Sequence, residues 1–131
     1  MKLLLDTHIW VWSLLEPRNL SRRVARALES AENELWLSPL STWELLMLVE
    51  KGRVVLDLEA SAWVSKALSM VPLKEAPLTH EVALETREVH LPHRDPVDRL
   101  LAATARVFGL TLVTADQRLI AAKGLSTLAN R

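Results

Sequence analysis

Short apolar runs alternate with longer helix-like stretches along almost the whole of this 131-residue chain. The runs at residues 2–5, 35–37 and 110–114 are too short for helices and mainly apolar, as expected of buried strands. The stretches between them carry the capping residues, first-turn prolines and terminal glycines that bound helices. This alternation predicts an α/β fold in which helices cover a mostly parallel central sheet.

Most of the expected helices begin at a capping residue or a proline. The expected helices cover residues 7–15, 22–31, 39–51, 60–68, 80–89, 96–108 and 117–122. Further short strands are expected at residues 53–56, 71–74 and 125–128. The three glycines of the chain all fall at ends of expected helices, where a left-handed backbone conformation often closes the last turn.

Length and composition predict one soluble domain that spans residues 1–131. The 16 basic and 16 acidic side chains balance, so any basic surface for a nucleic acid must be local. The absence of cysteine excludes disulfides, zinc–thiolate sites and cysteine nucleophiles. No apolar run is long enough to span a bilayer, and Asp6 and His8 interrupt the apolar start of the chain. We therefore expect a cytoplasmic protein that does not bind a membrane.

Four acidic residues lie where expected strands end and expected helices begin. They are Asp6, Glu44, Asp98 and Asp116. In open α/β sheets, ligands bind outside the carboxyl ends of the strands, so these four side chains are candidates for one common site. Convergence there would concentrate negative charge, which usually implies a bound cation. A metal-dependent enzyme is the leading hypothesis from this pattern.

Helix capping is the structural alternative for several of these acids. An aspartate that caps a helix stabilises it by about 1 kcal/mol. Capping alone would account for Asp6 and for Asp116, so both interpretations stay open for each of them. In the segment Asp95-Pro96-Val97-Asp98, the first aspartate resembles a cap and the second an acid favoured by the helix dipole.

Glu44 and Asp98 are harder to explain in structural terms alone. If Ser38 caps a helix that begins at Pro39, Ser41 already lies inside that helix and cannot form a capping box with Glu44. Glu44 is also the single charge in an apolar stretch, so its helix is expected to be buried. A buried carboxylate must be paired, bind a metal or become neutral. Asp98 shares a helical face with apolar residues three, four and seven positions further on, which predicts that it faces the core.

Electrostatic repulsion favours a cation if the four acids converge. Two carboxylates about 4 Å apart repel by roughly 4 kcal/mol at an effective dielectric constant of about 20. Several such pairs would outweigh the gain from a few helix caps. Ligands that are all oxygen suit Mg²⁺ or Mn²⁺, and such ions serve phosphodiester cleavage.

Four segments of the chain resemble the motifs of PIN-domain ribonucleases, and more narrowly those of VapC-type toxins of bacterial and archaeal toxin–antitoxin pairs. The segments are residues 5–7, 41–45, 93–103 and 112–116. They occur in the expected order and span essentially the whole chain. The most specific of them contains Asp95-Pro96-Val97-Asp98-Arg99.

The resemblance implies a Rossmann-like PIN domain with helices on both faces of the sheet. It also implies an endoribonuclease that hydrolyses RNA phosphodiester bonds with metal-activated water, Mg²⁺ or Mn²⁺ being the cofactor. The implied partners are an RNA substrate, a small cognate antitoxin protein and a second copy of the chain in a homodimer.

Residue roles follow from the same resemblance by position. The catalytic and metal-binding acids are expected to be Asp6, Glu44, Asp98 and Asp116. Asp95 is expected to support these ligands or to replace one of them. Thr7 and Thr114 match hydroxyl positions that orient a carboxylate or water. Arg94 lies beside the expected site in the sequence and is the candidate for a contact with a substrate phosphate.

Other classes of protein fit less well. A receiver domain needs an acidic pair after its first strand, and only Asp6 stands there. A nucleotide-binding Rossmann protein needs a glycine-rich first turn, and residues 6–9 contain no glycine. The stronger alternative is a catalytically inactive PIN-like module that binds protein or RNA, although the complete four-acid set argues against it.

The tryptophans have structural and functional interpretations. Trp36 and Trp43 are expected in the core. Trp10 and Trp12 are candidates for base stacking or for a dimer or antitoxin groove, with core packing expected for at least one of them.

A basic cluster lies on one of the expected helices and consists of Arg22, Arg23 and Arg26. Contacts with RNA phosphates are the functional interpretation of this cluster. A solvated helix face is the more common outcome, so we expect these side chains to lie mainly in solvent.

Overall fold

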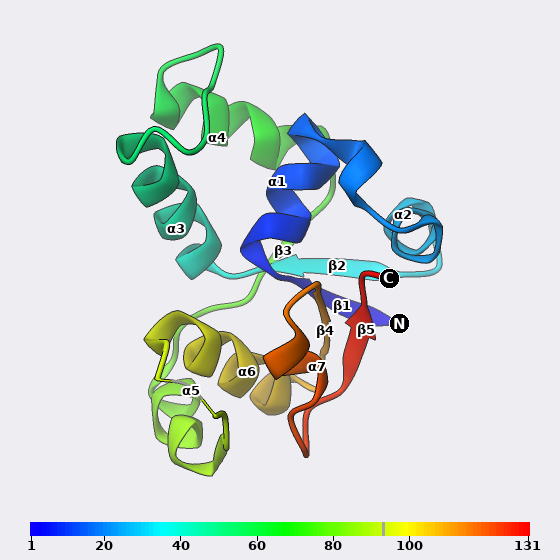
Figure 1. Cartoon of the computed structure of the whole chain (residues 1–131), viewed down its shortest axis with the longest axis vertical. Helices are drawn as coiled ribbons and strands as arrows, with labels where there is room; N and C mark the ends of the chain where they lie inside the picture. Colours follow the sequence, from blue (N-terminus) through cyan, green and yellow to red (C-terminus); the bar gives the residue numbers. More distant parts are fainter. Residues whose placement is uncertain (93) are drawn as a thin grey trace.

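The computed structural model describes residues 1–92 and 94–131, and within these ranges five strands form one parallel sheet (Figure 1). The strands are β1 (Lys2–Leu5), β2 (Glu34–Leu37), β3 (Lys74–Glu75), β4 (Thr111–Thr114) and β5 (Thr127–Ala129). Their order across the sheet is β3-β2-β1-β4-β5, and every neighbouring pair is parallel. The predicted α/β fold with a parallel sheet is confirmed.

The helices of the described residues connect these strands. They are α1 (Thr7–Leu15), α2 (Arg22–Glu29), α3 (Pro39–Glu50), α4 (Ala60–Met70), α5 (His80–Glu85), α6 (Pro96–Phe108) and α7 (Gln117–Ile120), with short 3-10 helices η1 (Pro17–Asn19) and η2 (Thr86–Glu88). Figure 1 shows α1, α3 and α4 on one side of the sheet and α5 and α6 on the other. None of the helices in residues 1–92 and 94–131 has the length and apolar character needed to cross a bilayer.

Successive residues of β1 face opposite layers of helices. Leu3 and Leu5 belong to the apolar core that α1, α2 and α4 cover. Leu4 belongs to a second core, which includes Leu101 and Ala105 of α6. All three leucines of β1 are almost fully buried. A strand buried on both faces reads as a continuous apolar run, which is why residues 2–5 are so clear in the sequence.

The order of the strands reverses at β1. The chain runs from β1 outward to β2 and β3, and then returns to the other side of β1 to form β4 and β5. Such a reversal opens a crevice at the carboxyl ends of the two central strands, where α/β proteins bind their ligands. Leu5 pairs with Val113 in the register of β1 and β4, and the backbone N–H of Asp6 continues this ladder by donating to the carbonyl of Val113 (3.0 Å).

Several expectations at the level of elements are wrong or shifted. Residues 53–56 contain no strand, and β3 lies at residues 74–75 rather than 71–74. The helix expected over residues 80–89 ends at Glu85 and continues as η2. Trp43 is 51% exposed instead of buried, and only Ser41 and Leu45 of α3 are buried. Helix α3 is apolar nearly all round, yet it packs one face on α1 and α4 and leaves the other open.

The other tryptophans pack within the fold. Trp10 is 2% exposed and meets Trp63 edge to face, so the expectation that at least one of Trp10 and Trp12 packs in the core is confirmed. Trp12 is half-buried against the same core. Trp36 is also half-buried and stacks on Phe108.

Candidate active site

Asp6 stands at the carboxyl end of β1 and is held by groups on two different elements. Its Oδ1 accepts a hydrogen bond from the backbone N–H of Thr7 (2.8 Å), which caps α1. Its Oδ2 accepts a hydrogen bond from the Thr114 hydroxyl at the end of β4 (2.7 Å). Asp6 can therefore both cap α1 and take part in a site, because one carboxylate oxygen bonds to the helix N-terminus and the other bonds to Thr114 on the neighbouring strand.

Burial raises the pKa of Asp6 from its ordinary value of 3.8 to about 6. The negative charges of Asp98 and Glu44 contribute to this rise, while the hydrogen bonds from Thr114 and Thr7 oppose it. Both neighbouring carboxylates are thus near enough to act on Asp6. Burial and these two negative charges together outweigh the hydrogen bonds that favour the ionised form of Asp6.

Glu44 approaches this edge from the second turn of α3. One of its carboxylate oxygens accepts a hydrogen bond from the hydroxyl of Thr7, which is fully buried at the start of α1. The Thr7 hydroxyl also lies 3.0 Å from the hydroxyl of Ser41, one turn before Glu44 on the same helix. Ser38 caps α3 through the N–H of Leu40, so Glu44 does not serve as a capping residue.

Asp98 and Asp95 lie at the start of α6. Asp95 caps the helix by accepting hydrogen bonds from the N–H groups of Val97 (2.9 Å) and Asp98 (3.4 Å). Asp98 is only 9% exposed, as its position on the core-facing stripe predicts, whereas Asp95 is exposed. Arg94 is exposed beside Asp95. His93, part of the motif that carries the family resemblance, lies outside the described residues.

Asp116 is tied to β4 on one side and to α7 on the other. Its N–H donates to the hydroxyl of Thr114 (3.1 Å), the same hydroxyl that donates to Asp6. Its carboxylate caps α7 by accepting a hydrogen bond from the backbone N–H of Arg118 (2.9 Å). It also accepts two hydrogen bonds from the guanidinium of Arg118, from Nε (3.2 Å) and from Nη2 (3.0 Å). The hydrogen bond to Asp116, together with the charges of Asp98 and Asp95, raises the pKa of Arg118.

The four acids gather at one edge of the sheet but do not close around one point. The charges of Glu44 and Asp98 both act on Asp6, and the charges of Asp98 and Asp116 both act on Arg118. Within residues 1–92 and 94–131, however, no three carboxylate or imidazole side chains stand close enough to hold a metal ion as they are placed. In this arrangement Glu44 accepts a hydrogen bond from Thr7, and Asp116 forms an ion pair with Arg118.

Two residues of this network do not emerge from the sequence alone. Ser41 shares a helical face with Glu44 three residues later, and this spacing could have marked it. Arg118 stands two residues after Asp116, a spacing at which its side chain can fold back and bond to the aspartate that caps its helix. Neither signal is specific without the fold, because both spacings are common in ordinary helices.

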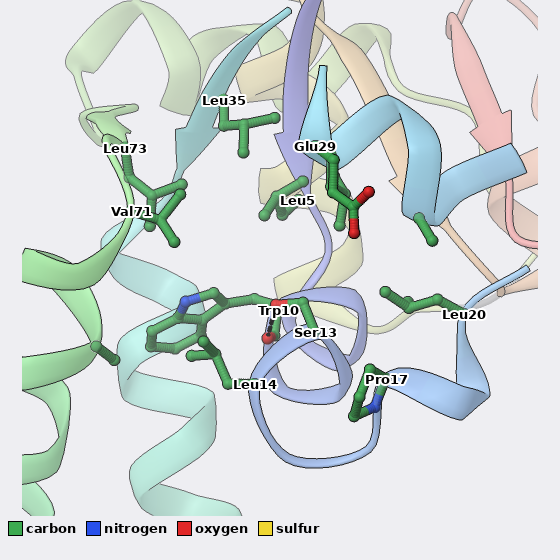
Figure 2. Close-up of a pocket in the computed structure, with 13 residues that line it drawn as sticks. Leu5, Trp10, Ser13, Leu14, Pro17, Leu20, Glu29, Leu35, Val71 and Leu73 are labelled. Carbon is green, nitrogen blue, oxygen red and sulfur yellow. Dashed lines mark hydrogen bonds between the residues drawn. The ribbon is translucent and has the colours of Figure 1, made fainter. Parts of the chain in front are cut away.

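Two of the hollows on the described surface differ clearly in character. One, of about 210 Å³, is lined by apolar side chains except for Ser13 and Glu29, and Figure 2 shows the leucines of the sheet facing Trp10 across it. The other, of about 630 Å³, lies beside the acids and is lined by His90, Pro92, Gln117, Arg118, Ala121, Ala122 and Lys123. The first contains none of the four acids and no cationic side chain, so it does not suit an anionic polymer.

Comparison with known proteins agrees with this architecture. The family model of the PIN domain matches residues 3–125. Ribonuclease VapC22 of Mycobacterium tuberculosis (strain ATCC 25618 / H37Rv) is 37% identical over 119 residues, which is 88% of each chain.

Solved structures show the same fold at lower identity. A chain of VapBC2 from Rickettsia felis, bound to a DNA fragment from its promoter, matches with a TM-score of 0.73 and 18% identity over 98% of both chains. A chain of FitAcB from Neisseria gonorrhoeae matches with a TM-score of 0.67 and 21% identity over 98% of this chain and 97% of that one. The match to the family model over residues 3–125 and the 37% identity to Ribonuclease VapC22 show that the chain belongs to the PIN-domain family, in its VapC branch.

Proposed function

We propose that this protein is a metal-dependent endoribonuclease and the toxin of a toxin–antitoxin pair. The observation that carries the proposal is the buried carboxylate of Asp6, whose pKa rises to about 6 beside Glu44 and Asp98 at the switch point of the sheet. A site with excess negative charge at this place suits a cation-assisted reaction on an anionic substrate. The relative named Ribonuclease VapC22 supports RNA as that substrate.

The residues present fit a divalent metal ion. All candidate ligands are carboxylate oxygens, which Mg²⁺ and Mn²⁺ prefer, and the negative charges of Asp98 and Glu44 both act on the buried Asp6. The ion would be held by Asp6, Glu44, Asp98 and Asp116, with Asp95 as an alternative ligand. When bound, it would activate water and neutralise charge on the transferring phosphate.

The neighbouring polar groups would keep these carboxylates in position. The Thr114 hydroxyl fixes Oδ2 of Asp6 and also receives the N–H of Asp116, so it links two of the acids. The Thr7 hydroxyl fixes Glu44. Because these hydroxyls are fully buried, they cannot exchange their partners for water, and the carboxylates lose little orientational freedom when they bind a ligand.

A partner protein is part of the proposal. The Rickettsia felis structure is titled as a VapBC2 assembly, and a similar structure from Klebsiella pneumoniae is titled as a toxin–antitoxin complex. These titles support a small antitoxin as the partner of this chain. The homodimer and the phosphate contact of Arg94 stay predictions from the sequence.

Cleavage of RNA by the purified protein tests the proposed activity. We expect cleavage of a single-stranded RNA with Mn²⁺ and none with EDTA. Asp98→Asn should reduce the rate by about a hundredfold or more, because charge stabilisation by a metal ion is worth several kcal/mol. The matched control is Asp57→Asn, which removes an exposed carboxylate outside the acidic edge and should leave cleavage unchanged.

Circular dichroism distinguishes loss of activity from loss of fold in both variants. A folded Asp98→Asn protein that cleaves as fast as the wild type would overturn the proposed site. Wild-type protein that binds RNA without cleaving it, with or without Mn²⁺, would favour the inactive binding module instead.

A further inference from the structure

The hollow of about 630 Å³ beside the acids has a distinct charge. Its lining contains the cationic side chains of Arg118 and Lys123 and the imidazole of His90. None of the described residues that line it is acidic. The guanidinium of Arg118 forms an ion pair with Asp116 (3.0 Å), so the positive charge of this acid-free lining rests mainly on Lys123, with the imidazole of His90 beside it. We call this hollow the basic groove.

Both walls of the basic groove are anchored to helix α6. The guanidinium of Arg99 donates to the carbonyl of Val89 (2.6 Å), which immediately precedes His90 on one wall. The guanidinium of Arg106 donates to the carbonyl of Gly124 (2.7 Å), which immediately follows Lys123 on the other. The basic residues therefore stand on fixed segments, and such preorganisation lowers the entropy cost of binding.

Arg118 connects the basic groove to the acidic edge. It lines the groove and at the same time holds Asp116 through two side-chain hydrogen bonds. A polymer with a phosphate at the acids would therefore have its adjoining phosphates beside Arg118 and then Lys123. The remaining lining of proline and alanines is small and apolar, so it offers space without repelling a sugar–phosphate chain.

We propose that the basic groove binds the phosphodiester backbone of single-stranded RNA on one side of the scissile bond. Lys123 and His90 contact phosphates, and Arg118 marks the junction with the acids. This assignment rests on the proposed ribonuclease function and deepens it. It predicts backbone contacts, so the groove contributes affinity and little sequence preference.

Binding of a fluorescein-labelled oligouridylate tests the assignment by fluorescence anisotropy in EDTA, where no cleavage occurs. Loss of one phosphate contact lowers the slope of log K against log salt by about 0.7 for a single strand, which is about fivefold in affinity at about 0.1 M salt. We expect this loss for Lys123→Ala and a larger one when His90→Ala is added. The control is Lys66→Ala, which removes an equal charge from the exposed face of α4.

The outcomes separate this inference from the proposed function. If the wild type cleaves RNA but Lys123→Ala and the double variant bind the oligouridylate as Lys66→Ala does, the groove assignment is wrong and the ribonuclease proposal stands. If the wild type neither cleaves nor binds RNA, both are wrong. A labelled oligoaspartate peptide is the second probe. If Lys123→Ala weakens binding of this peptide but not of the oligouridylate, the groove binds an acidic protein and the RNA assignment is wrong.

Discussion

At the scale of single residues, Thr114 has a larger role than its size suggests. Its buried hydroxyl donates to Asp6 and accepts from the N–H of Asp116, so Thr114→Val removes two interactions without changing the shape of the side chain much. An unsatisfied buried polar group costs about 1–3 kcal/mol, and we expect Thr114→Val to lower the free energy of unfolding by that amount. RNA cleavage should fall as well, because Asp6 loses a group that orients it.

A matched control is available on α6. Thr104 is equally buried, but its hydroxyl donates to the carbonyl of Leu100 within the same helix and contacts none of the four acids among the described hydrogen bonds. Thr104→Val should therefore cost less stability in urea unfolding and leave cleavage unchanged. Equal effects of the two substitutions on cleavage would contradict the role assigned to Thr114.

The raised pKa of Asp6 predicts how stability depends on pH in the absence of metal. Between pH 3.8 and about 6, the unfolded chain releases the Asp6 proton while the folded protein retains it. The folded state then binds more protons, so the free energy of unfolding decreases as pH rises through this window and stays lower above it. A shift of about two pH units corresponds to about 3 kcal/mol as an upper value.

Asp6→Asn should remove this penalty while it keeps a residue that can cap α1. In urea unfolding with EDTA, we expect the variant to be more stable than the wild type near pH 7 and similar to it near pH 4. A variant that is less stable than the wild type at both pH values would contradict the electrostatic strain inferred at this edge.

At the scale of elements, the turn after α7 depends on a contact with α6. Gly109 and Gly124 both have left-handed φ angles, 65° and 74°, so alanine at either position costs about 1 kcal/mol or more in backbone strain. A Cβ at Gly109 meets nothing within 4 Å, whereas one at Gly124 would lie 2.7 Å from Nη1 of Arg106. Gly124→Ala should therefore also break the hydrogen bond from Arg106.

The comparison of these two variants isolates that contact. We expect Gly124→Ala to be less stable than Gly109→Ala by about 1 kcal/mol in urea unfolding, which is the usual value of one hydrogen bond. Equal stability would mean that the arginine moves aside freely and does not anchor the turn that carries Lys123.

Elements whose boundaries are set by local chemistry could be predicted from the sequence. The apolar run of β1 and the Asp95–Pro96 start of α6 agree with the structure to the residue. Besides the shifted bounds of β3 and α5, the main error concerns α3, because an apolar stretch indicates that some partner covers a helix but not which face is covered. The exposure of Trp43 follows from the tertiary arrangement of α1 and α4 around α3, which no local pattern encodes.

At the scale of the whole molecule, topology decides which acids meet. The sequence indicated that Asp6 and Asp116 follow strands, but the strand order β2-β1-β4 is what puts Thr114 against Asp6. The sequence also indicated a common site, and the structure brings Glu44 and Asp98 near enough to act on Asp6. It could not indicate that the Thr7 hydroxyl bonds to Glu44, because a hydrogen bond between residues 37 positions apart depends on the assembled fold.

These features together predict that binding of a metal ion is coupled to release of a proton. A carboxylate must be deprotonated to bind a cation, so below pH 6 the apparent affinity for Mn²⁺ should fall by up to about tenfold for each pH unit. At Mn²⁺ concentrations well above Kd, each tenfold loss of affinity removes about 1.4 kcal/mol of stabilisation.

We expect Mn²⁺ to increase the free energy of unfolding of the wild type by about 1 kcal/mol more near pH 7 than near pH 5. Asp6→Asn should lose this difference, whereas Asp57→Asn should keep it. If Mn²⁺ stabilises the wild type equally at both pH values, the cation binds away from Asp6, and the reaction centre would have to be sought elsewhere than between β1 and β4.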